Sequence, residues 1–352
     1  MIKTRITEMF GIKHPIMLAG MNWITEPNIV STVCNAGGLG VFAMAHCTPE
    51  EARKNIRKIR NLTDKPFGVN MILNIPTARA NIKVAIEEKV PVINYALGKP
   101  WFIDDVHAYG GKVIGTIAKA KHAAQSEKMG VDVISITGHE AAAHGMEATS
   151  MILIPIVTSW AKVPLIAAGG FVDGRGLAAA LALGAEAVSM GTRFMLSKES
   201  TVHEQMKQAC LNASEEDTLY SDVFDGLPSR VLKNKLSEAM VKGGFPLFSA
   251  AANAFKVKKL LRLSMWQFIR TSVGMMKAEE KRSLLDQARF ANAVILSEKA
   301  IYDGDVENGL LLAGQSCGSI NDMPGCKEII DHTIAQAEEI LKKLGANCVT
   351  DN

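Results

Sequence analysis

The centre of the chain reads Leu165-Ile-Ala-Ala-Gly-Gly-Phe-Val-Asp-Gly-Arg-Gly176, and further on it reads Val188-Ser-Met-Gly-Thr-Arg-Phe194. Each stretch has the form of a buried apolar strand that ends in small residues, which let the backbone approach a bound group closely. In a barrel of parallel strands, the loops after the last two strands commonly hold a ligand phosphate, because backbone N–H groups and a helix dipole favour an anion there. The candidate phosphate-binding residues are Gly169, Gly170, Gly191 and Thr192.

The same pattern repeats through the first half of the chain. Short β-branched apolar runs end at small or polar residues, and a stretch with helical spacing follows each of them, as in consecutive βα units. The predicted strands are residues 15–19, 38–43, 67–73, 90–95, 112–116, 132–136, 164–168 and 187–190. Eight parallel strands with helical connections predict an α/β fold, the closed (β/α)8 TIM barrel, whereas a doubly wound open sheet usually stops at about five or six.

After residue 195 the pattern becomes helical, without strand-like runs. We therefore expect a barrel formed by residues 1–199 and 301–352, with a helical subdomain appended at residues 200–300. This subdomain either packs on the barrel or contributes a lid or substrate groove. Residues 329–343 have the spacing of a closing amphipathic helix. The apolar face of the subdomain is predicted from Phe245, Phe248, Phe255, Met265, Trp266, Phe268, Met275 and Met276.

The composition is that of an ordinary soluble globular protein. The 352 residues are 48% hydrophobic, and the net charge of +3 comes from 39 basic and 36 acidic residues spread along the chain, which gives no sign of a nucleic-acid partner. The six cysteines show no metal-ligand spacing, so free thiols in a reducing compartment are expected. We find no signal peptide or membrane span, and we predict a cytoplasmic protein with a small-molecule substrate. The sequence leaves open whether it is a monomer or a homodimer.

The loop after the sixth predicted strand, Thr137-Gly-His-Glu-Ala-Ala-Ala-His-Gly145, carries two histidines at the face where barrel enzymes build active sites. No third histidine or further acidic partner lies near them in sequence, so a zinc site is not expected. Acid–base catalysis suits a histidine better, since its ordinary pKa lies near neutrality. We favour His144 for this role, while His139 more simply hydrogen-bonds within the loop.

Two further residues lie at predicted strand ends. Asn70 ends the third strand and is polar where a barrel interior would be apolar, and its amide suits the pyrimidine edge of a flavin. The alternative is an asparagine that only closes the strand. Met21 follows the first strand and would lie against a ligand at the barrel mouth, or else it is an ordinary core methionine.

Together these residues make the chain resemble the flavin-dependent nitronate monooxygenases, formerly called 2-nitropropane dioxygenases, over nearly its whole length. The same group includes NAD(P)H:quinone reductases and flavin-containing enoyl-acyl-carrier-protein reductases. The motifs that carry the resemblance are His14-Pro-Ile-Met-Leu-Ala-Gly-Met21, Asn35-Ala-Gly-Gly-Leu-Gly40, Leu62-Thr-Asp-Lys-Pro-Phe-Gly-Val-Asn70, Glu140-Ala-Ala-Ala-His144, Ala167-Ala-Gly-Gly-Phe-Val-Asp-Gly174, Met190-Gly-Thr-Arg-Phe194 and Ala313-Gly-Gln315.

The resemblance implies bound FMN, with His144 as the catalytic residue on the substrate side. The implied cofactor-binding residues are Ala19, Gly20, Met21, Asn70, Thr116, Thr137, Ala142, Ala143, Gly169, Gly170, Ser189, Met190, Gly191, Thr192 and Gln315. The sequence departs from the family in one loop, where Ala142 and Ala143 replace two usual glycines and Thr137 replaces an acidic residue or glutamine. The added methyl groups narrow the approach to a flavin.

The resemblance implies oxidation of alkyl nitronates by O2 as the first expected activity, with FMN supplying the redox chemistry. The first alternative is an NAD(P)H-dependent reductase of quinones or enoyl thioesters. No Gly-x-Gly-x-x-Gly follows a strand, which weakens a Rossmann-type site without excluding a nicotinamide laid over the flavin. A third interpretation is a barrel that binds FMN or a phosphorylated metabolite without redox turnover.

Overall fold

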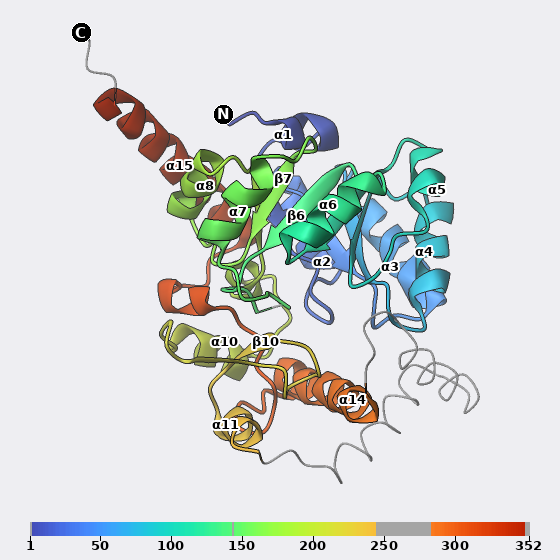
Figure 1. Cartoon of the computed structure of the whole chain (residues 1–352), viewed down its shortest axis with the longest axis vertical. Coiled ribbons are helices and arrows are strands. Elements are labelled where there is room, and N and C mark those ends of the chain that lie inside the picture. The colour runs from blue at the N-terminus through green and yellow to red at the C-terminus, as the bar shows by residue number, and fades with distance from the viewer. Residues whose placement is uncertain (1, 143, 244–282, 349–352) are drawn as a thin grey trace.

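Eight parallel strands form the centre of the computed structural model, which describes residues 2–142, 144–243 and 283–348 (Figure 1). The strands are β1 (Ile16–Leu18), β2 (Val41–Ala43), β3 (Gly68–Ile72), β4 (Val92–Ala96), β5 (Lys112–Ile117), β6 (Val133–Thr137), β7 (Leu165–Ala168) and β8 (Ala187–Met190). They are arranged in the order β1-β8-β7-β6-β5-β4-β3-β2, and every neighbouring pair is parallel. Each predicted strand overlaps one of them.

The two edges of this sheet meet and close a barrel. Met17 of β1 forms a parallel bridge with Leu39, which lies just before β2. The backbone N–H of Leu18 donates to the carbonyl of Leu39 at 2.9 Å, and the N–H of Leu39 donates to the carbonyl of Ile16 at the same distance. The predicted TIM-barrel fold is therefore confirmed.

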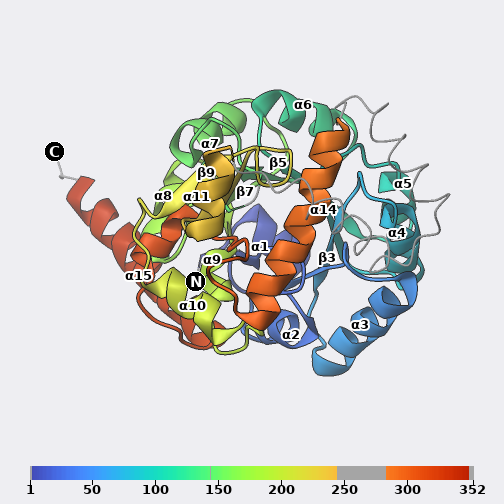
Figure 2. The same cartoon turned by 90° about the horizontal axis from the view of Figure 1, so that it is seen from below.

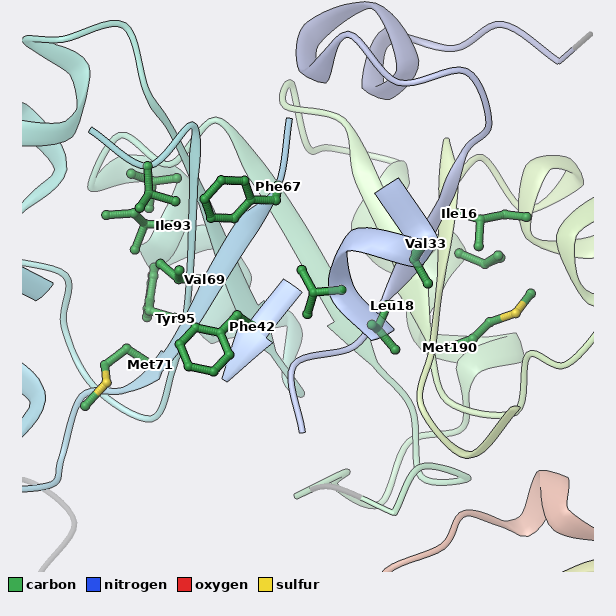
Figure 3. Packing of buried hydrophobic residues seen from close by; sticks show 14 of the residues in the cluster. Ile16, Leu18, Val33, Phe42, Phe67, Val69, Met71, Ile93, Tyr95 and Met190 are labelled. Atoms are coloured by element: carbon green, nitrogen blue, oxygen red, sulfur yellow. The ribbon is translucent and has the colours of Figure 1, made fainter. Parts of the chain in front are cut away.

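Alternate strand residues face either the barrel interior or the surrounding helices, as the two-residue period of a strand requires. The residues between strands and helices include Leu18, Phe42 and Tyr95, which pack in a continuous apolar layer (Figure 3). Ile6 and Phe10 of α1 (Arg5–Phe10) close the amino end of the barrel over an apolar interior. That interior consists of Met17, Leu39, Val41, Val92, Ile114, Val133, Ile166 and Ala187.

Seven helices follow the first seven strands around the outside. They are α2 (Pro27–Asn35), α3 (Pro49–Leu62), α4 (Ala78–Glu87), α5 (Ile103–His107), α6 (Ala120–Lys128), α7 (Ser150–Thr158) and α8 (Gly174–Ala182). Local sequence sets several of their starts: Thr48 and Glu51 form a capping box on α3, and the carboxylate of Asp173 accepts hydrogen bonds from the first N–H groups of α8.

The eighth position around the barrel is filled by α15 (Cys326–Cys348), which packs against both α8 and α2. Gly174 allows the close approach of α8, because a Cβ there would lie 2.4 Å from the backbone nitrogen of Ala337. The N–H of Gly174 also donates to the Gln336 side chain at 2.8 Å. The predicted helix at residues 329–343 is confirmed, and it completes the ring of helices after a long excursion of the chain.

The described parts of that excursion, within residues 191–325, lie against the carboxyl ends of the strands, where α14 crosses the barrel mouth in Figure 2. Its described elements are α9 (Thr192–Met195), α10 (Glu204–Leu211), β9 (Thr218–Ser221), β10 (Ser229–Leu232), α11 (Lys235–Val241), α14 (Leu284–Glu298), the π-helix η1 (Lys299–Asp303) and the 3-10 helix η2 (Gln315–Ser319).

The expectation that residues 200–300 contain no strand is wrong, because β9 and β10 pair as an antiparallel hairpin. Each strand has only four residues, and β9 is half-buried throughout, so neither produces a recognisable alternating pattern. The predicted aromatic and methionine face, from Phe245 to Met276, lies outside the described residues. Within the part of the chain that the structure describes, no helix is both long and apolar enough to cross a membrane. The described cysteines are free and buried, as predicted: Cys34, Cys47, Cys210, Cys317 and Cys326.

Candidate active site

The carboxyl half of the barrel interior is polar, in contrast to the apolar amino half. Asn70, Thr116, Thr137 and Ser189 each lie two or four residues after an inward-facing position, so their side chains also face inward. Asn70, Thr137 and Ser189 are buried, and the Thr116 hydroxyl donates to Asn94 Oδ1 at 2.8 Å across the β4–β5 pair. These inward side chains surround the space at the barrel mouth.

The side chain of Met190 does not belong to this ring. It faces the apolar layer between β8 and the helices, where Figure 3 shows it near Leu18. Its backbone carbonyl accepts a hydrogen bond from the N–H of Ala19 at 3.1 Å. Only the backbone of this predicted cofactor-binding residue therefore faces the mouth, because strand alternation turns its side chain outward.

The ends of β1 and β3 are packed tightly together. A Cβ on Gly20 would lie 2.4 Å from the Cβ of Asn70, so a side chain at position 20 would displace Asn70. The amide nitrogen of Asn70 lies 3.5 Å from the carbonyl oxygen of Gly20. Gly20 thus holds the Asn70 amide at the mouth of the barrel.

Gly191, after β8, is loosely packed on the side where a side chain would be. Its φ of −100° is accessible to any residue. A Cβ at this position would meet only the sulfur of Met21 at 3.4 Å and the Cβ of Ala19 at 3.9 Å. Neither backbone conformation nor packing in the described residues requires glycine here, whereas a ligand that approaches the backbone closely would require it.

Gly169 and Gly170, after β7, are glycines for a different reason. Their φ values are +95° and +85°, in the left-handed region that side chains disfavour. A Cβ on Gly169 would also lie 3.1 Å from the carbonyl oxygen of Gly138. The hydroxyl of Ser150, at the start of α7, donates to the Gly169 carbonyl at 2.8 Å. The fold itself therefore demands small residues at this strand end.

Glu140 organises the loop after β6. Its carboxylate accepts hydrogen bonds from the backbone and the hydroxyl of Ser150 at 3.0 Å, which places a negative charge at the amino end of α7. Its carbonyl accepts from the N–H of Gln315 at 2.9 Å. The N–H of Gly314 donates to the Thr192 hydroxyl at 3.1 Å, so the 313–315 segment joins the ends of β6 and β8.

Of the two predicted contact residues Ala142 and Ala143, the structure describes only Ala142. Ala142 belongs to the described loop, and its backbone nitrogen would lie 3.2 Å from a Cβ on Gly314. Ala143 lies outside the described residues. The loop after β6 therefore packs against the 313–315 segment on its Ala142 side.

His144 is bound by a carboxylate from the excursion. Its Nε2 lies 2.6 Å from Asp225 Oδ2, and both side chains are largely buried. The other carboxylate oxygen of Asp225 accepts from the N–H of Leu227 at 3.0 Å, which fixes the carboxylate in the β9–β10 turn. Among the described residues, Nδ1 of His144 has no hydrogen-bond partner. This arrangement orients the imidazole and leaves one ring nitrogen for a ligand.

His139 is held within its own loop. Its Nδ1 lies 3.0 Å from the carbonyl oxygen of Met146, and its ring packs edge-on against Tyr220 at 4.3 Å. The carbonyl of His139 accepts from Arg230 at 3.1 Å, and the Tyr220 hydroxyl donates to the Gly145 carbonyl at 2.8 Å. The β9–β10 hairpin and its turn thereby contact the loop at His139, His144 and Gly145.

Three residues at the mouth were not predicted from the sequence. Asp225 lies in an Asp-Gly turn, which signals a hairpin but gives no sign of its partner. Asn94 interrupts the apolar run of β4 as Asn70 interrupts β3, and that same signal could have identified it. Asn22, directly after Met21, has a buried Oδ1 without a hydrogen-bond partner among the described residues.

These features fit a flavin. The loosely packed backbone at Gly191 could admit a ligand group, the Asn70 amide can donate and accept, and the unpaired Asn22 oxygen needs a donor. A metal centre has no corresponding support: residues 2–142, 144–243 and 283–348 contain no group of three or more His, Cys, Asp or Glu residues placed to hold an ion.

Comparison with known proteins agrees with this geometry. A family model described as nitronate monooxygenase matches residues 3–81 and 74–336. The chain belongs to the nitronate monooxygenase family. Membership in this family of oxidoreductases implies a flavin cofactor and confirms the family predicted from the sequence.

Within the nitronate monooxygenase family, the similarity extends to proteins with different names. The chain is 38% identical to (3aS,4S,5R,7aS)-5-hydroxy-7a-methyl-1-oxo-octahydro-1H-indene-4-carboxyl-CoA dehydrogenase of Rhodococcus jostii, with 98% of each chain covered. It is 32% identical to a probable nitronate monooxygenase of Staphylococcus aureus, over 68% of this chain and 80% of that protein. The solved structure of FabK from Thermotoga maritima has a TM-score of 0.81 and 36% identity, covering 99% of this chain and all of that one.

Proposed function

We propose that this protein is an FMN-dependent oxidoreductase that acts on the thioester of coenzyme A. The observation that carries the proposal is the match to a CoA-thioester dehydrogenase, which covers 98% of both chains and so includes the excursion as well as the barrel. The probable nitronate monooxygenase matches only 68% of this chain. The excursion supplies Asp225, the partner of His144, so full-length similarity bears directly on the site.

The site chemistry is consistent with oxidation next to a thioester carbonyl. The carbonyl acidifies the hydrogen on the adjacent carbon, and a positioned base can remove it as a proton. His144 is suited to this role, because Asp225 binds Nε2 and leaves Nδ1 free to accept the proton. FMN, when bound, supplies the two-electron chemistry by accepting the hydride from the next carbon.

The residues around the mouth would then hold the cofactor. Gly191 and the backbone at Gly169 and Gly170 would accommodate the phosphate, and the amides of Asn70 and Asn22 would face the polar edge of the flavin ring. In the oxidising direction, a two-electron acceptor such as O2 would have to take the electrons removed from the thioester. NAD(P)H would serve as the electron donor if the enzyme works in the direction of reduction.

Nitronate oxidation is the second candidate, and the family-model match over most of the chain favours it. In that reaction His144 would either bind the anionic nitronate or act as the base that forms it. The same site can thus serve both activities, because each needs a proton-transfer group beside a flavin.

Anaerobic mixing tests the two candidates directly. Purified FMN-loaded protein is mixed in turn with a saturated acyl-CoA, propyl nitronate, NADH and NADPH, and the visible absorbance of the flavin is followed. Bleaching by the acyl-CoA, or by NAD(P)H with re-oxidation by an enoyl-CoA, supports the thioester proposal. Bleaching by propyl nitronate alone overturns it in favour of nitronate oxidation. A His144→Ala variant that retains FMN is the matched control for chemistry at the site.

A further inference from the structure

An arginine and a tryptophan form an exposed stacked pair at the rim of the barrel mouth. The guanidinium of Arg79 lies over the ring of Trp101, 4.5 Å from its centroid. Trp101 is 40% exposed, and Arg79 is exposed as well. Neither residue takes part in the site described above. In the described part of the chain, Arg79 has no carboxylate partner, so its charge is available to a ligand.

The pair lies at the same end of the barrel as the candidate active site. Arg79 is in the first turn of α4, which follows β3, and Trp101 is in the loop after β4. These are the strands that end near Asn70 and Asn94, so the stacked pair borders the mouth on the β3–β4 side. A long substrate that reaches the flavin from this side would pass over it.

The arginine is held by a fixed helix start. Asn81, which is fully buried, donates from its amide to the carbonyls of Met44 and Cys47 at 2.9 and 3.0 Å. These two carbonyls belong to the loop after β2, so the first turn of α4 is tied to the neighbouring strand end. Arg79 therefore extends from a rigid element rather than from a free loop.

The tryptophan is held by a ladder of aromatic rings. Its ring packs edge-on against the buried Phe102 at 5.5 Å, and Phe102 packs edge-on against the buried Tyr95 at 6.2 Å. The Tyr95 hydroxyl is bonded to the Ser126 hydroxyl at 2.6 Å. Leu97, in the same loop, has a φ of +54°, a conformation that costs free energy in a residue with a branched side chain. The loop thus presents Trp101 in one fixed position at the cost of local strain.

We propose that Arg79 and Trp101 bind the phosphorylated adenosine end of the substrate. A purine ring stacks on an aromatic ring or on a guanidinium plane, and the guanidinium also pairs with phosphate. Coenzyme A carries adenosine 3′,5′-bisphosphate at the end opposite its thioester, so the stacked pair at the rim would anchor the far end while the thioester reaches His144. The assignment to CoA rests on the proposed function, whereas the affinity for an adenosine phosphate does not.

Binding of the adenosine fragment alone provides the first test. Adenosine 3′,5′-bisphosphate is titrated into the FMN-loaded protein by calorimetry, beside adenosine 2′,5′-bisphosphate, which represents the corresponding end of NADPH. We expect Trp101→Leu and Arg79→Gln each to weaken the tighter of the two by about tenfold or more. Trp101→Phe and Arg79→Lys separate stacking from charge, since phenylalanine keeps an aromatic face and lysine keeps only the charge.

A matched control is available elsewhere on the surface. Trp160 is 37% exposed and precedes β7, at the opposite end of the barrel. Trp160→Leu therefore removes an exposed tryptophan without affecting the rim, and it should leave the affinity for both bisphosphates unchanged. The flavin content and melting temperature of each variant are measured alongside, so that a misfolded variant is recognised and replaced by the conservative one.

Turnover provides the second test. If acyl-CoA is a substrate, the ratio of kcat/KM for the CoA thioester over the matching pantetheine thioester should fall about tenfold in Trp101→Leu. Preference for the 2′,5′-bisphosphate would assign the pair to NADPH instead of CoA. Loss of fragment binding in the variants supports the inference even if no acyl-CoA is turned over. No fragment binding by the parent protein, or equal binding by parent and variants, overturns it even if acyl-CoA is a good substrate.

Discussion

Gly191→Ala isolates the contribution of the cofactor from that of the fold. In the protein alone, the new methyl group would meet the Met21 sulfur at 3.4 Å and the Ala19 Cβ at 3.9 Å, both ordinary contact distances, and φ is already −100°. The stability of the flavin-free protein should therefore change by no more than about 0.5 kcal/mol. With a ligand against the backbone, the same methyl group overfills the site, which typically costs about 1–3 kcal/mol.

That cost corresponds to a roughly 5- to 150-fold weaker Kd for FMN. The measurement is a titration of FMN into flavin-free protein, together with melting temperatures with and without excess FMN. Because ligand stabilisation grows with the logarithm of the ligand concentration divided by Kd, the stabilisation that excess FMN gives the variant should be smaller than in the parent by the same ~1–3 kcal/mol, seen as a smaller increase in melting temperature.

Gly169→Ala is the contrasting variant, because there φ is +95° and the methyl group would lie 3.1 Å from the Gly138 carbonyl oxygen. It should destabilise the flavin-free protein by about 1–2 kcal/mol. If Gly191→Ala binds FMN as tightly as the parent, or if it lowers flavin-free stability as much as Gly169→Ala does, the assignment of the Gly191 space to the cofactor is refuted.

The remaining predictions concern the two histidines, the carboxylate that binds His144, and one structural carboxylate. His144→Ala should lower kcat/KM by roughly 10²-fold or more with FMN still bound, and Asp225→Asn should lower it by roughly tenfold or more. His139→Ala should lower it much less. Steady-state kinetics on the best substrate measure these losses, and a larger loss for His139→Ala would contradict the assignment. Burial alone would raise the pKa of Asp132, but hydrogen bonds from a backbone N–H, a histidine and a lysine hold that pKa below its ordinary value. Because the pKa is lowered in the folded state, the ionised Asp132 stabilises the fold at neutral pH, and this contribution is lost as the pH falls through the folded pKa. Asp132→Asn should therefore be less stable than the parent at pH 7 but match it in acid. An equal deficit in the free energy of urea unfolding at both pH values would be inconsistent with this.

The barrel was predictable because parallel strands are buried on both faces and leave nearly continuous apolar runs, as in residues 132–136. The polar positions at strand ends were equally visible, since Asn70 breaks such a run. The small residues after β7 and β8 were recognised as a group, but only the structure separates Gly169, which the backbone requires, from Gly191, which the protein alone does not.

Long-range pairs were beyond the reach of sequence patterns. His144 and Asp225 are 81 residues apart, and nothing in an Asp-Gly turn specifies which loop it will face. The same holds for Arg79 and Trp101, which come from different βα units and meet only when the barrel closes. Local periodicity identifies elements, whereas the partners of a polar side chain depend on how those elements are arranged.

The position of α15 has a consequence for the order in which the protein is assembled during synthesis. The last barrel strand, β8, leaves the ribosome well before the helix that closes the ring, and residues 191–325 come between them. Until α15 arrives, the outer sides of α8 and α2 lack their neighbour, so the apolar groups that α15 covers stay in water. The excursion is thus tethered to the barrel at one end only until α15 docks, and the chain must bring its C-terminal helix back across a long loop, a slow and entropically costly closure.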